Sequence, residues 1–182
     1  IRRYYTISED LFLINAHNGY IENSNSIPAI NINEYPFIKA HIDNIEKKRI
    51  NGDFGERAKK AKGLYKRDDQ GTTPYNLRSC AYVSKFFKPK ICFPGVVTTK
   101  DFFKIRMHYD ELSIINNPAS FISGRSLKFL LGILNSKLNN WSFYNFIGTR
   151  LHKDGMRFYL NDIQKIRIPE PQQDLKSNIE EL

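Results

Sequence analysis

Residues 51–71 carry the side chains best suited to a chemical role, in the sequence NGDFGERAKKAKGLYKRDDQG. No acidic residue falls between Arg57 and Arg67. The basic side chains of this stretch, with its single tyrosine, are Arg57, Lys59, Lys60, Lys62, Tyr65, Lys66 and Arg67. Ammonium and guanidinium groups bind phosphate oxygens, and an aromatic ring stacks on a nucleobase. The pattern therefore suits contact with a nucleic acid.

A run of basic charge is also typical of a solvated surface, and composition alone does not separate the two interpretations. The glycines of the stretch predict a mobile or tightly turned loop, of a length that often carries function. Ala58 and Ala61 leave a short basic helix as an alternative to that loop. Both interpretations of the charge and both local structures stay open on the sequence.

A second basic loop lies near the C-terminal end of the chain. Residues 148–154 read GTRLHKD and hold Arg150, His152 and Lys153. These three side chains are the next candidates for DNA contact if the lysine-rich stretch is not the contact.

Residues 72–82 contain a third candidate group. The side chains of Asn76 and Arg78 are of the types that hydrogen-bond to base edges in the major groove. In the competing interpretation, Tyr75 and Leu77 pack in the interior while Arg78 braces the loop. The sequence favours neither.

The chain lacks the patterns expected of a catalyst. It has no glycine-rich phosphate loop, no His-Glu-x-x-His zinc helix and no nucleophile elbow. Cys80 and Cys92 stand among apolar and aromatic residues, and we expect buried, reduced thiols of a cytoplasmic protein. Without suitably spaced histidines they do not predict a zinc site. We therefore predict no catalytic residue and no metal ligand, and the sequence does not support a disulfide, although two cysteines would allow one.

A long helix over about 126–146 is the main predicted element of the C-terminal half. Its apolar residues recur at three- and four-residue steps: Leu127, Leu130, Leu131, Leu134, Leu138 and Trp141. Ser126 is a candidate cap for its start, and Gly148 is placed to end it. We expect the apolar stripe to face the core and Asn139 to lie on the opposite, polar face.

A second helix is predicted over about 36–50, because Pro36 suits a first turn. Its apolar stripe consists of Phe37, Ile38, His41, Ile42 and Ile45. Short strands are expected at 90–93 and 119–123, while residues 15–26 are expected to be mostly loop. The sequence thus predicts an α+β fold in which short mixed strands pack around the long helix.

The length of 182 residues suits one domain, which we place at residues 1–171, followed by a polar connecting stub at 172–182. The formal net charge of +9 favours an anionic partner such as nucleic acid. No apolar run approaches the ~18 residues needed to span a bilayer, so no membrane association is expected. The chain begins without Met, and we expect it to be a fragment of a larger protein.

Five short motifs follow one another along the chain. They are Tyr35-Pro36 with Ile38-Lys39 and His41; Tyr75-Asn76-Leu77-Arg78; Lys88-Pro89-Lys90-Ile91; Leu130-Leu131-Gly132-Ile133-Leu134-Asn135-Ser136-Lys137-Leu138; and Ile166 to Pro171. This succession resembles the TaqI-like C-terminal specificity domain, which follows the catalytic domain of adenine-specific DNA methyltransferases. That family is common in restriction enzymes that fuse nuclease, methyltransferase and target-recognition parts. The Asn-Ser-Lys-Leu motif is also similar to recognition domains of multi-subunit restriction systems.

The resemblance implies a sequence-specific, non-catalytic target-recognition domain that binds double-stranded DNA. Methyl transfer would belong to an upstream methyltransferase domain of the same chain, so S-adenosylmethionine is expected only there and no cofactor is expected in this fragment. The parent protein would be an adenine-specific methyltransferase, a type II restriction endonuclease, or both. One alternative is a protein-interaction module or the specificity subunit of a multi-subunit restriction system. The other is an enzyme, a nuclease or methyltransferase whose catalytic residues form no recognised motif. The residues that read bases vary within the family and are not carried over.

Overall fold

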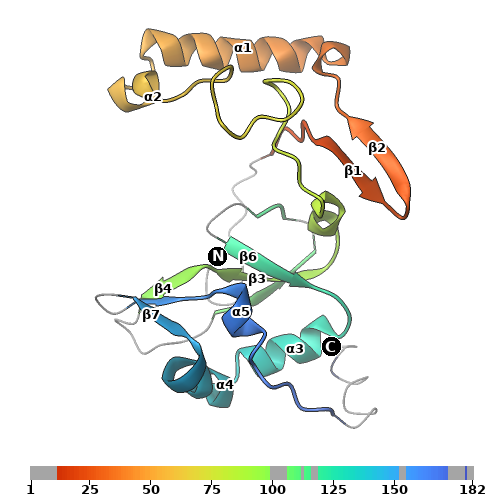
Figure 1. The fold of residues 1–182 in the computed structure, drawn as a ribbon, viewed down its shortest axis with the longest axis vertical. Coiled ribbons are helices and arrows are strands. Elements are labelled where there is room, and N and C mark those ends of the chain that lie inside the picture. Colours follow the sequence, from red (N-terminus) through yellow and green to blue (C-terminus); the bar gives the residue numbers. More distant parts are fainter. Residues whose placement is uncertain are drawn as a thin grey trace. The chain divides into compact units, whose positions relative to one another are not determined.

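The computed structural model describes residues 12–98, 106–111, 113–115, 119–151, 155–171 and 179, and Figure 1 shows its fold. Within these ranges it contains five α-helices and eight strands in three small sheets, so the predicted α+β class is confirmed. Contacts divide the chain into two compact units, one covering Phe12–Ser84 and one that includes the chain from Lys85 onward. The assignment of residues 1–171 to one domain stays a prediction.

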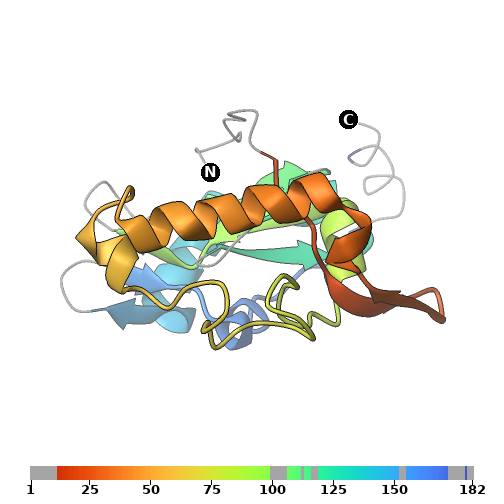
Figure 2. The same ribbon diagram turned by 90° about the horizontal axis from the view of Figure 1, so that it is seen from above.

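The N-terminal unit consists of a β-hairpin, two helices and a long irregular segment (Figures 1 and 2). Its elements are β1 (Asn18–Glu22), β2 (Asn25–Ala29), η1 (Ile32–Glu34), α1 (Pro36–Asn51) and α2 (Glu56–Lys60). The strands β1 and β2 pair in an antiparallel two-stranded sheet. Residues 15–26, expected to be mostly loop, therefore contain all of β1 and the start of β2.

The boundaries of α1 follow from its terminal residues. Pro36 occupies the first turn, where its missing N–H costs no helical hydrogen bond. Gly52 ends the helix in the left-handed conformation, with φ 92°, and its N–H donates to the carbonyl of Lys48 at 3.1 Å. The predicted helix over about 36–50 is confirmed.

The face that α1 turns to its own unit is not the apolar stripe. No residue of α1 is fully buried, and the Phe37 side chain is 90% exposed. Ile45 is also exposed, whereas Asp43 and Glu46 are half-buried. The segment packed against α1 offers a tyrosine hydroxyl and backbone carbonyls, so α1 turns polar side chains toward it.

Hydrogen bonds rather than apolar packing hold the N-terminal unit together. Its fully buried apolar residues are small in number, namely Ala16 and Ile32. The Asn76 side chain is 1% exposed and donates from Nδ2 to the carbonyls of His17, at 3.2 Å, and Ile30, at 2.9 Å. Because each bond ties the irregular segment to the chain around the hairpin, the unit has a fixed framework without a large core.

The C-terminal unit contains two three-stranded antiparallel sheets and several short helices. Its elements are β3 (Lys90–Pro94), β4 (Val96–Thr98), β5 (His108–Asp110), β6 (Ala119–Ser123), α3 (Leu127–Leu134), α4 (Lys137–Ser142), η3 (Phe143–Ile147), β7 (Thr149–Leu151), β8 (Gly155–Arg157) and α5 (Leu160–Ile163); η2 (Val83–Phe87) precedes them. The sheet orders are β5-β3-β6 and β4-β8-β7. The expected strands at 90–93 and 119–123 are confirmed as β3 and β6.

A single apolar cluster forms the core of this unit. Its buried members are Ile91, Phe93, Met107, Leu127, Leu134, Phe143, Met156 and Phe158. The rings of Phe143 and Phe158 stack at 4.8 Å between centroids, with an interplanar angle of 10°. The cluster thereby joins both sheets to α3 and to the helical turn that follows α4.

The long helix expected over about 126–146 is broken in the middle. The side-chain amide of Asn135 makes two hydrogen bonds with the backbone of Met107. Its Oδ1 accepts from the Met107 N–H at 3.0 Å, and its Nδ2 donates to the Met107 carbonyl at 2.8 Å. Ser136 is extended, with ψ 153°, and its hydroxyl caps α4 by accepting from the Asn139 N–H at 3.1 Å. The tertiary bond at Asn135 and the cap at Ser136 therefore end one helix and start another.

The break changes which side chains are buried. Leu134 is buried as predicted, but Leu138 is 74% exposed and Trp141 is 58% exposed. Asn139, expected on the solvent face, is instead buried, and its Nδ2 donates to the Leu134 carbonyl at 2.8 Å. Ser126 makes no side-chain cap, contrary to expectation. Gly148 does follow the last helical turn, as predicted.

Lys90 is a fully buried cation on the central strand β3. Its Nζ lies 3.1 Å from Oδ1 of Asp110, its cross-strand partner on β5, and donates to the Phe86 carbonyl at 3.0 Å. Ser113 in turn donates to the Asp110 carboxylate from its N–H and its hydroxyl, both at 2.7 Å. The buried charge is therefore paired and hydrogen-bonded, as burial requires.

The two cysteines differ in environment. Cys92 is buried in β3, and desolvation raises the pKa of its thiol to about 11. Cys80 is half-buried, so the expectation of burial is wrong for this residue. Neither cysteine forms a disulfide. Among the residues described above, no helix is long and apolar enough to cross a membrane.

Candidate nucleic-acid interface

A cleft of about 470 Å³ lies in the N-terminal unit between α1 and the chain that runs through and beyond α2. It is lined by Glu46, Arg49, Ile50, Lys59, Lys60, Ala61, Lys62, Gly63, Tyr65 and Lys66. Five of the seven candidates from the lysine-rich stretch thus line one cleft; Arg57 and Arg67 do not. The short basic helix, left open on the sequence, is present as α2.

Arg49 holds the two sides of this cleft together. Its guanidinium binds both carboxylate oxygens of Glu46, each at 2.8 Å, one helical turn earlier on α1. The same group donates through Nη1 to three backbone carbonyls at the end of α2, those of Ala58, Lys59 and Ala61, at 2.9–3.1 Å. Because a guanidinium has a planar fork of donors, one side chain fixes both the carboxylate and the chain end.

Gly63 is required for this close approach. A Cβ atom placed on Gly63 would overlap the Glu46 carboxylate and the Arg49 guanidinium. Hydrogen bonding by Arg49 lowers the pKa of Glu46, burial opposes that effect, and a backbone hydrogen bond from Leu64 adds to it. Glu46 is therefore a carboxylate already satisfied by its own unit.

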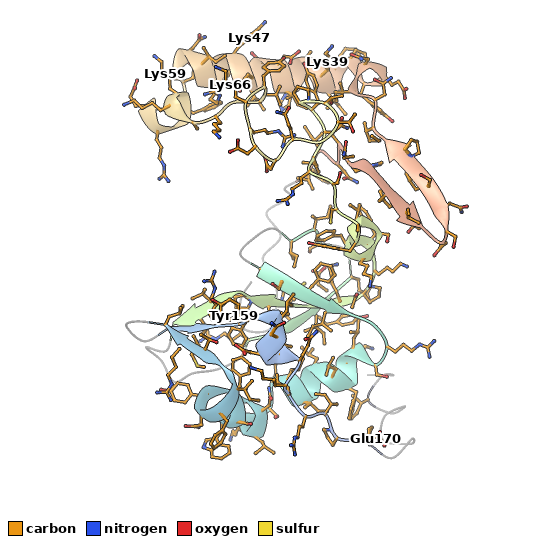
Figure 3. The ribbon with its side chains drawn as sticks, in the orientation of Figure 1. Lys39, Lys47, Lys59, Lys66, Tyr159 and Glu170 are labelled. Atoms are coloured by element: carbon orange, nitrogen blue, oxygen red, sulfur yellow. The ribbon has the colours of Figure 1, made fainter. Side chains whose placement is uncertain are left out.

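The lysines at the cleft are mostly unpaired. Lys59, Lys60 and Lys66 are exposed and form no ion pair within the part of the chain that the structure describes. Lys62 is different, because its Nζ lies 2.6 and 2.5 Å from the two carboxylate oxygens of Asp68. Figure 3 shows Lys59 and Lys66 at the α2 end of α1. Arg57 lies on α2, is exposed and is likewise without an ion pair in the described chain.

Tyr65 and Tyr75 form a hydrogen-bonded pair next to the cleft. Their hydroxyls are 3.1 Å apart, their rings meet edge to face at 6.3 Å, and Tyr75 donates to Oδ1 of Asp43 at 2.8 Å. The hydrogen bond with Tyr65, followed by burial and the bond to Asp43, raises the pKa of Tyr75. Tyr65 remains exposed, so part of its ring is available for stacking.

Arg67 and Asn76, both candidate contacts for DNA, instead form hydrogen bonds within the N-terminal unit. Arg67 donates through Nη2 to the carbonyls of Pro74, at 3.0 Å, and Asn76. The Asn76 amide is buried, and its Oδ1 accepts hydrogen bonds from the N–H and the hydroxyl of Thr73. Its Nδ2 donates to the His17 carbonyl at the base of the hairpin. An amide without exposed surface has no route to a base edge, so Asn76 is removed from the candidate contacts.

Arg78 and Arg150 are exposed but stand outside the cleft. The bracing role considered for Arg78 falls instead to Arg67. Arg150 lies on β7 in the C-terminal unit, with its guanidinium 4.8 Å from the centroid of the Tyr144 ring, a cation–π contact. His152 and Lys153 lie outside the described residues.

Sequence reasoning missed Glu46 and Arg49 as parts of the site. Their three-residue spacing on a predicted helix was a signal for an ion pair, but the carbonyl partners of Arg49 follow only from the fold. Asp43 and Glu46 also place two carboxylates one turn apart, with Lys48 two residues on, a set of groups suited to metal-assisted hydrolysis. Here Asp43 binds Tyr75 and Glu46 binds Arg49, so these carboxylates are engaged within the unit.

No group of three or more histidine, cysteine or acidic side chains in the described ranges is arranged to hold a metal ion. Comparison with models of known protein families gives no match to this sequence, and comparison with curated proteins gives none either. The function is therefore inferred from the charges and the exposed side chains of the cleft.

Proposed function

We propose that this chain is a sequence-specific DNA-binding domain, the target-recognition part of a restriction-modification enzyme of the TaqI-like type. The observation that carries the proposal is the cleft, where Lys59, Lys60 and Lys66 present exposed ammonium groups without a competing acid. Phosphate oxygens of a duplex supply the missing negative charge. The net charge of +9 supports the same partner.

Electrostatics at the cleft favours a backbone contact over a catalytic centre. The Glu46 carboxylate is neutralised by Arg49, which leaves the cleft with a net positive character. The pocket is open and lysine-rich, and such groups position a protein on DNA without reading its sequence. In this proposal the domain holds the duplex, while methyl transfer, S-adenosylmethionine binding and any cleavage belong to another domain of the same protein.

The proposal is tested by fluorescence anisotropy on a labelled duplex over a series of salt concentrations. We expect a non-specific Kd on the order of 10⁻⁴–10⁻⁶ M at physiological salt. Changing Lys59, Lys60 and Lys66 together to Ala should weaken binding and lower the salt slope by about 0.9 for each phosphate that the variant no longer neutralises. A wild-type chain without salt-dependent duplex binding would contradict the proposal.

A matched control separates a local effect from a loss of net charge. Lys85, Lys88 and Lys137 are exposed lysines of the C-terminal unit, and their joint change to Ala removes the same charge. This control should keep most of the salt slope, because none of its lysines lines the cleft. Equal losses in the two triple variants would show that binding depends on overall charge and not on the cleft.

One observation favours a second function, a protein-interaction module within a multi-subunit restriction system. Leu138, Trp141 and Phe146 are exposed apolar side chains on α4 and η3, and the rings of Trp141 and Phe146 meet edge to face at 5.2 Å. Exposed aromatic groups of this kind are frequent at protein interfaces. Protein contacts release few counterions, so association that is insensitive to salt would favour this second function.

A further inference from the structure

The β1–β2 hairpin is a regular ribbon with a two-residue turn. Asn23 and Ser24 form the turn with φ of 48° and 67°, and Glu22 pairs with Asn25 as the last rung of the ladder. Two successive residues with positive φ match the twist of an antiparallel ribbon, and Asn adopts this conformation more readily than most residues. Figures 1 and 2 show the hairpin extending beyond the end of α1 that is opposite to α2.

The base of the hairpin is firmly attached to the rest of its unit. Asn18, the first residue of β1, donates from Nδ2 to the Ser79 hydroxyl at 2.7 Å and accepts from the Thr72 N–H at 2.6 Å. The buried Asn76 amide binds the carbonyls of His17 and Ile30, which flank the two strands. The tip is therefore presented on a fixed support, as a recognition element requires.

The tip carries hydrogen-bonding groups that the fold does not use. Asn23, Ser24, Asn25 and Ser26 are all exposed. Their side chains form no hydrogen bond with any residue in the described part of the chain. Ile21 beside them is 69% exposed. The ribbon thus offers amides, hydroxyls and one aliphatic group to a partner.

We infer that this hairpin tip enters the major groove of DNA and reads base edges; the inference rests on the proposed DNA-binding function. The major groove is about 12 Å wide and admits a two-stranded ribbon. An asparagine amide pairs with N6 and N7 of adenine, and an aliphatic side chain contacts the methyl group of thymine. Glu22 is the one acid beside the turn, and its carboxylate can accept from N4 of cytosine.

The lysine cleft and the hairpin can engage one duplex together. They lie at opposite ends of α1, whose 16 residues span about 24 Å. That length corresponds to about seven base-pair steps, at about 3.4 Å per step. The lysines then hold phosphates while the tip reads bases, a division of work common to DNA-binding proteins.

The experiment is selection of binding sites by the whole chain from a duplex library with a randomised central segment. We compare the wild-type chain with Asn23→Gly combined with Asn25→Ser, in which the glycine keeps the positive φ of the turn. We expect the variant to lose at least about tenfold in preference for the selected sequence over the unselected library. Its salt slope and non-specific affinity should stay within about twofold, because the lysines are intact.

Two further variants keep the inference falsifiable. Asn23→Asp retains a residue that tolerates the turn but replaces the amide donor with a carboxylate, so the preferred base should change from adenine toward cytosine. Asn44→Ala changes an exposed amide on α1 and should leave the preference intact. Circular dichroism of each variant confirms that it is folded.

The outcomes separate this inference from the function on which it rests. No duplex binding by the wild-type chain contradicts the proposed function itself. Wild-type binding with a sequence preference that survives the hairpin variants overturns the inference alone. Wild-type binding without any preference contradicts both the inference and the sequence specificity of the proposed function. Loss of preference in the hairpin variants with a retained salt slope supports the inference.

Discussion

Arg49 binds both carboxylate oxygens of Glu46, with Nε 2.8 Å from Oε2 and Nη2 2.8 Å from Oε1. Through its remaining terminal nitrogen the same guanidinium binds three carbonyls at the end of α2. The pair thus connects α1 to the segment that carries the candidate lysines. Any change that weakens it should alter both the stability of the N-terminal unit and the arrangement of the cleft.

The pH dependence of stability should reveal this pair. Hydrogen bonding by Arg49 lowers the pKa of Glu46 from its ordinary value of 4.5. A carboxyl with a lowered folded-state pKa stabilises the fold above its unfolded-state pKa, and this stabilisation is lost as the pH falls through the folded-state value. The urea midpoint of the wild type should therefore exceed that of Glu46→Gln at neutral pH, and the difference should close well below pH 4.5.

Circular dichroism at the helical minimum is a suitable probe for this measurement, because α1 belongs to the same unit. The pKa values of Asp110 and Asp162 are also lowered. Burial raises the pKa of Asp110, but hydrogen bonds from Ser113 and Lys90 outweigh it. The hydrogen bond from Lys165 is the main cause of the lowered pKa of Asp162. Both carboxyls are present in the wild type and the variant, so the difference isolates Glu46. A difference that persisted unchanged into acid would contradict the pair's role.

Two glycine substitutions should change stability in opposite directions. Gly63→Ala forces a methyl group into the Glu46–Arg49 pair, and overpacking of this kind costs about 1–3 kcal/mol. Gly132→Ala lies in the exposed interior of α3 with no neighbouring atom within 4 Å of the new Cβ, so it should stabilise the chain by about 0.5–1 kcal/mol. Urea midpoints of the two variants check the prediction, and shifts of the same sign would refute it.

Local signals in the sequence predicted much of the fold. Pro36 and the residues after it predict α1, because helix boundaries depend on nearby residues. The apolar residues Ile91, Cys92 and Phe93 predict the buried strand β3. The break between α3 and α4 was not predictable in the same way. It depends on hydrogen bonds between Asn135 and Met107, which are 28 residues apart.

The residues of the candidate site also differ in whether the sequence alone could predict their roles. The lysines were identified from the sequence because exposed charges need no tertiary partner to be recognised. Asn76 was placed among the base-reading candidates because its residue type suits that role, yet its neighbours in space, His17 and Ile30, lie far away in sequence. The role of Arg49 was missed for the same reason, since its carbonyl partners come together only in the folded unit.

The break between α3 and α4 changes which side chains are buried, and mutation can test this directly. Leu134 is buried in the core, so Leu134→Ala should cost about 2–5 kcal/mol. Asn139→Ala should cost about 1–3 kcal/mol, because it removes the donor to the buried Leu134 carbonyl. Leu138→Ala, on the exposed side, should stay within about 0.5 kcal/mol. Denaturation that ranked Leu138 above Asn139 would contradict the observed break.

The ion pair between Lys62 and Asp68 bears on the proposed DNA binding rather than on stability. Both side chains are exposed, by 62% and 81%, and a surface pair of this kind contributes only about 0.2–1 kcal/mol. The pair does, however, neutralise one of the lysines at the cleft. In the proposed complex with DNA, phosphates would have to compete with Asp68 for the Lys62 ammonium group.

Asp68→Asn should therefore strengthen duplex binding while leaving the fold almost unchanged. The freed Lys62 can add a phosphate contact, so the salt slope should become steeper by up to about 0.9, with the largest gain in affinity at low salt. Asp53→Asn is the matched control: it makes the same change of charge in the same unit, but Asp53 forms no ion pair within the described chain. Anisotropy titrations over a salt series compare the two variants. A slope in Asp68→Asn no steeper than in Asp53→Asn would mean that Lys62 does not reach the phosphates, and would restrict the contact to Lys59, Lys60 and Lys66.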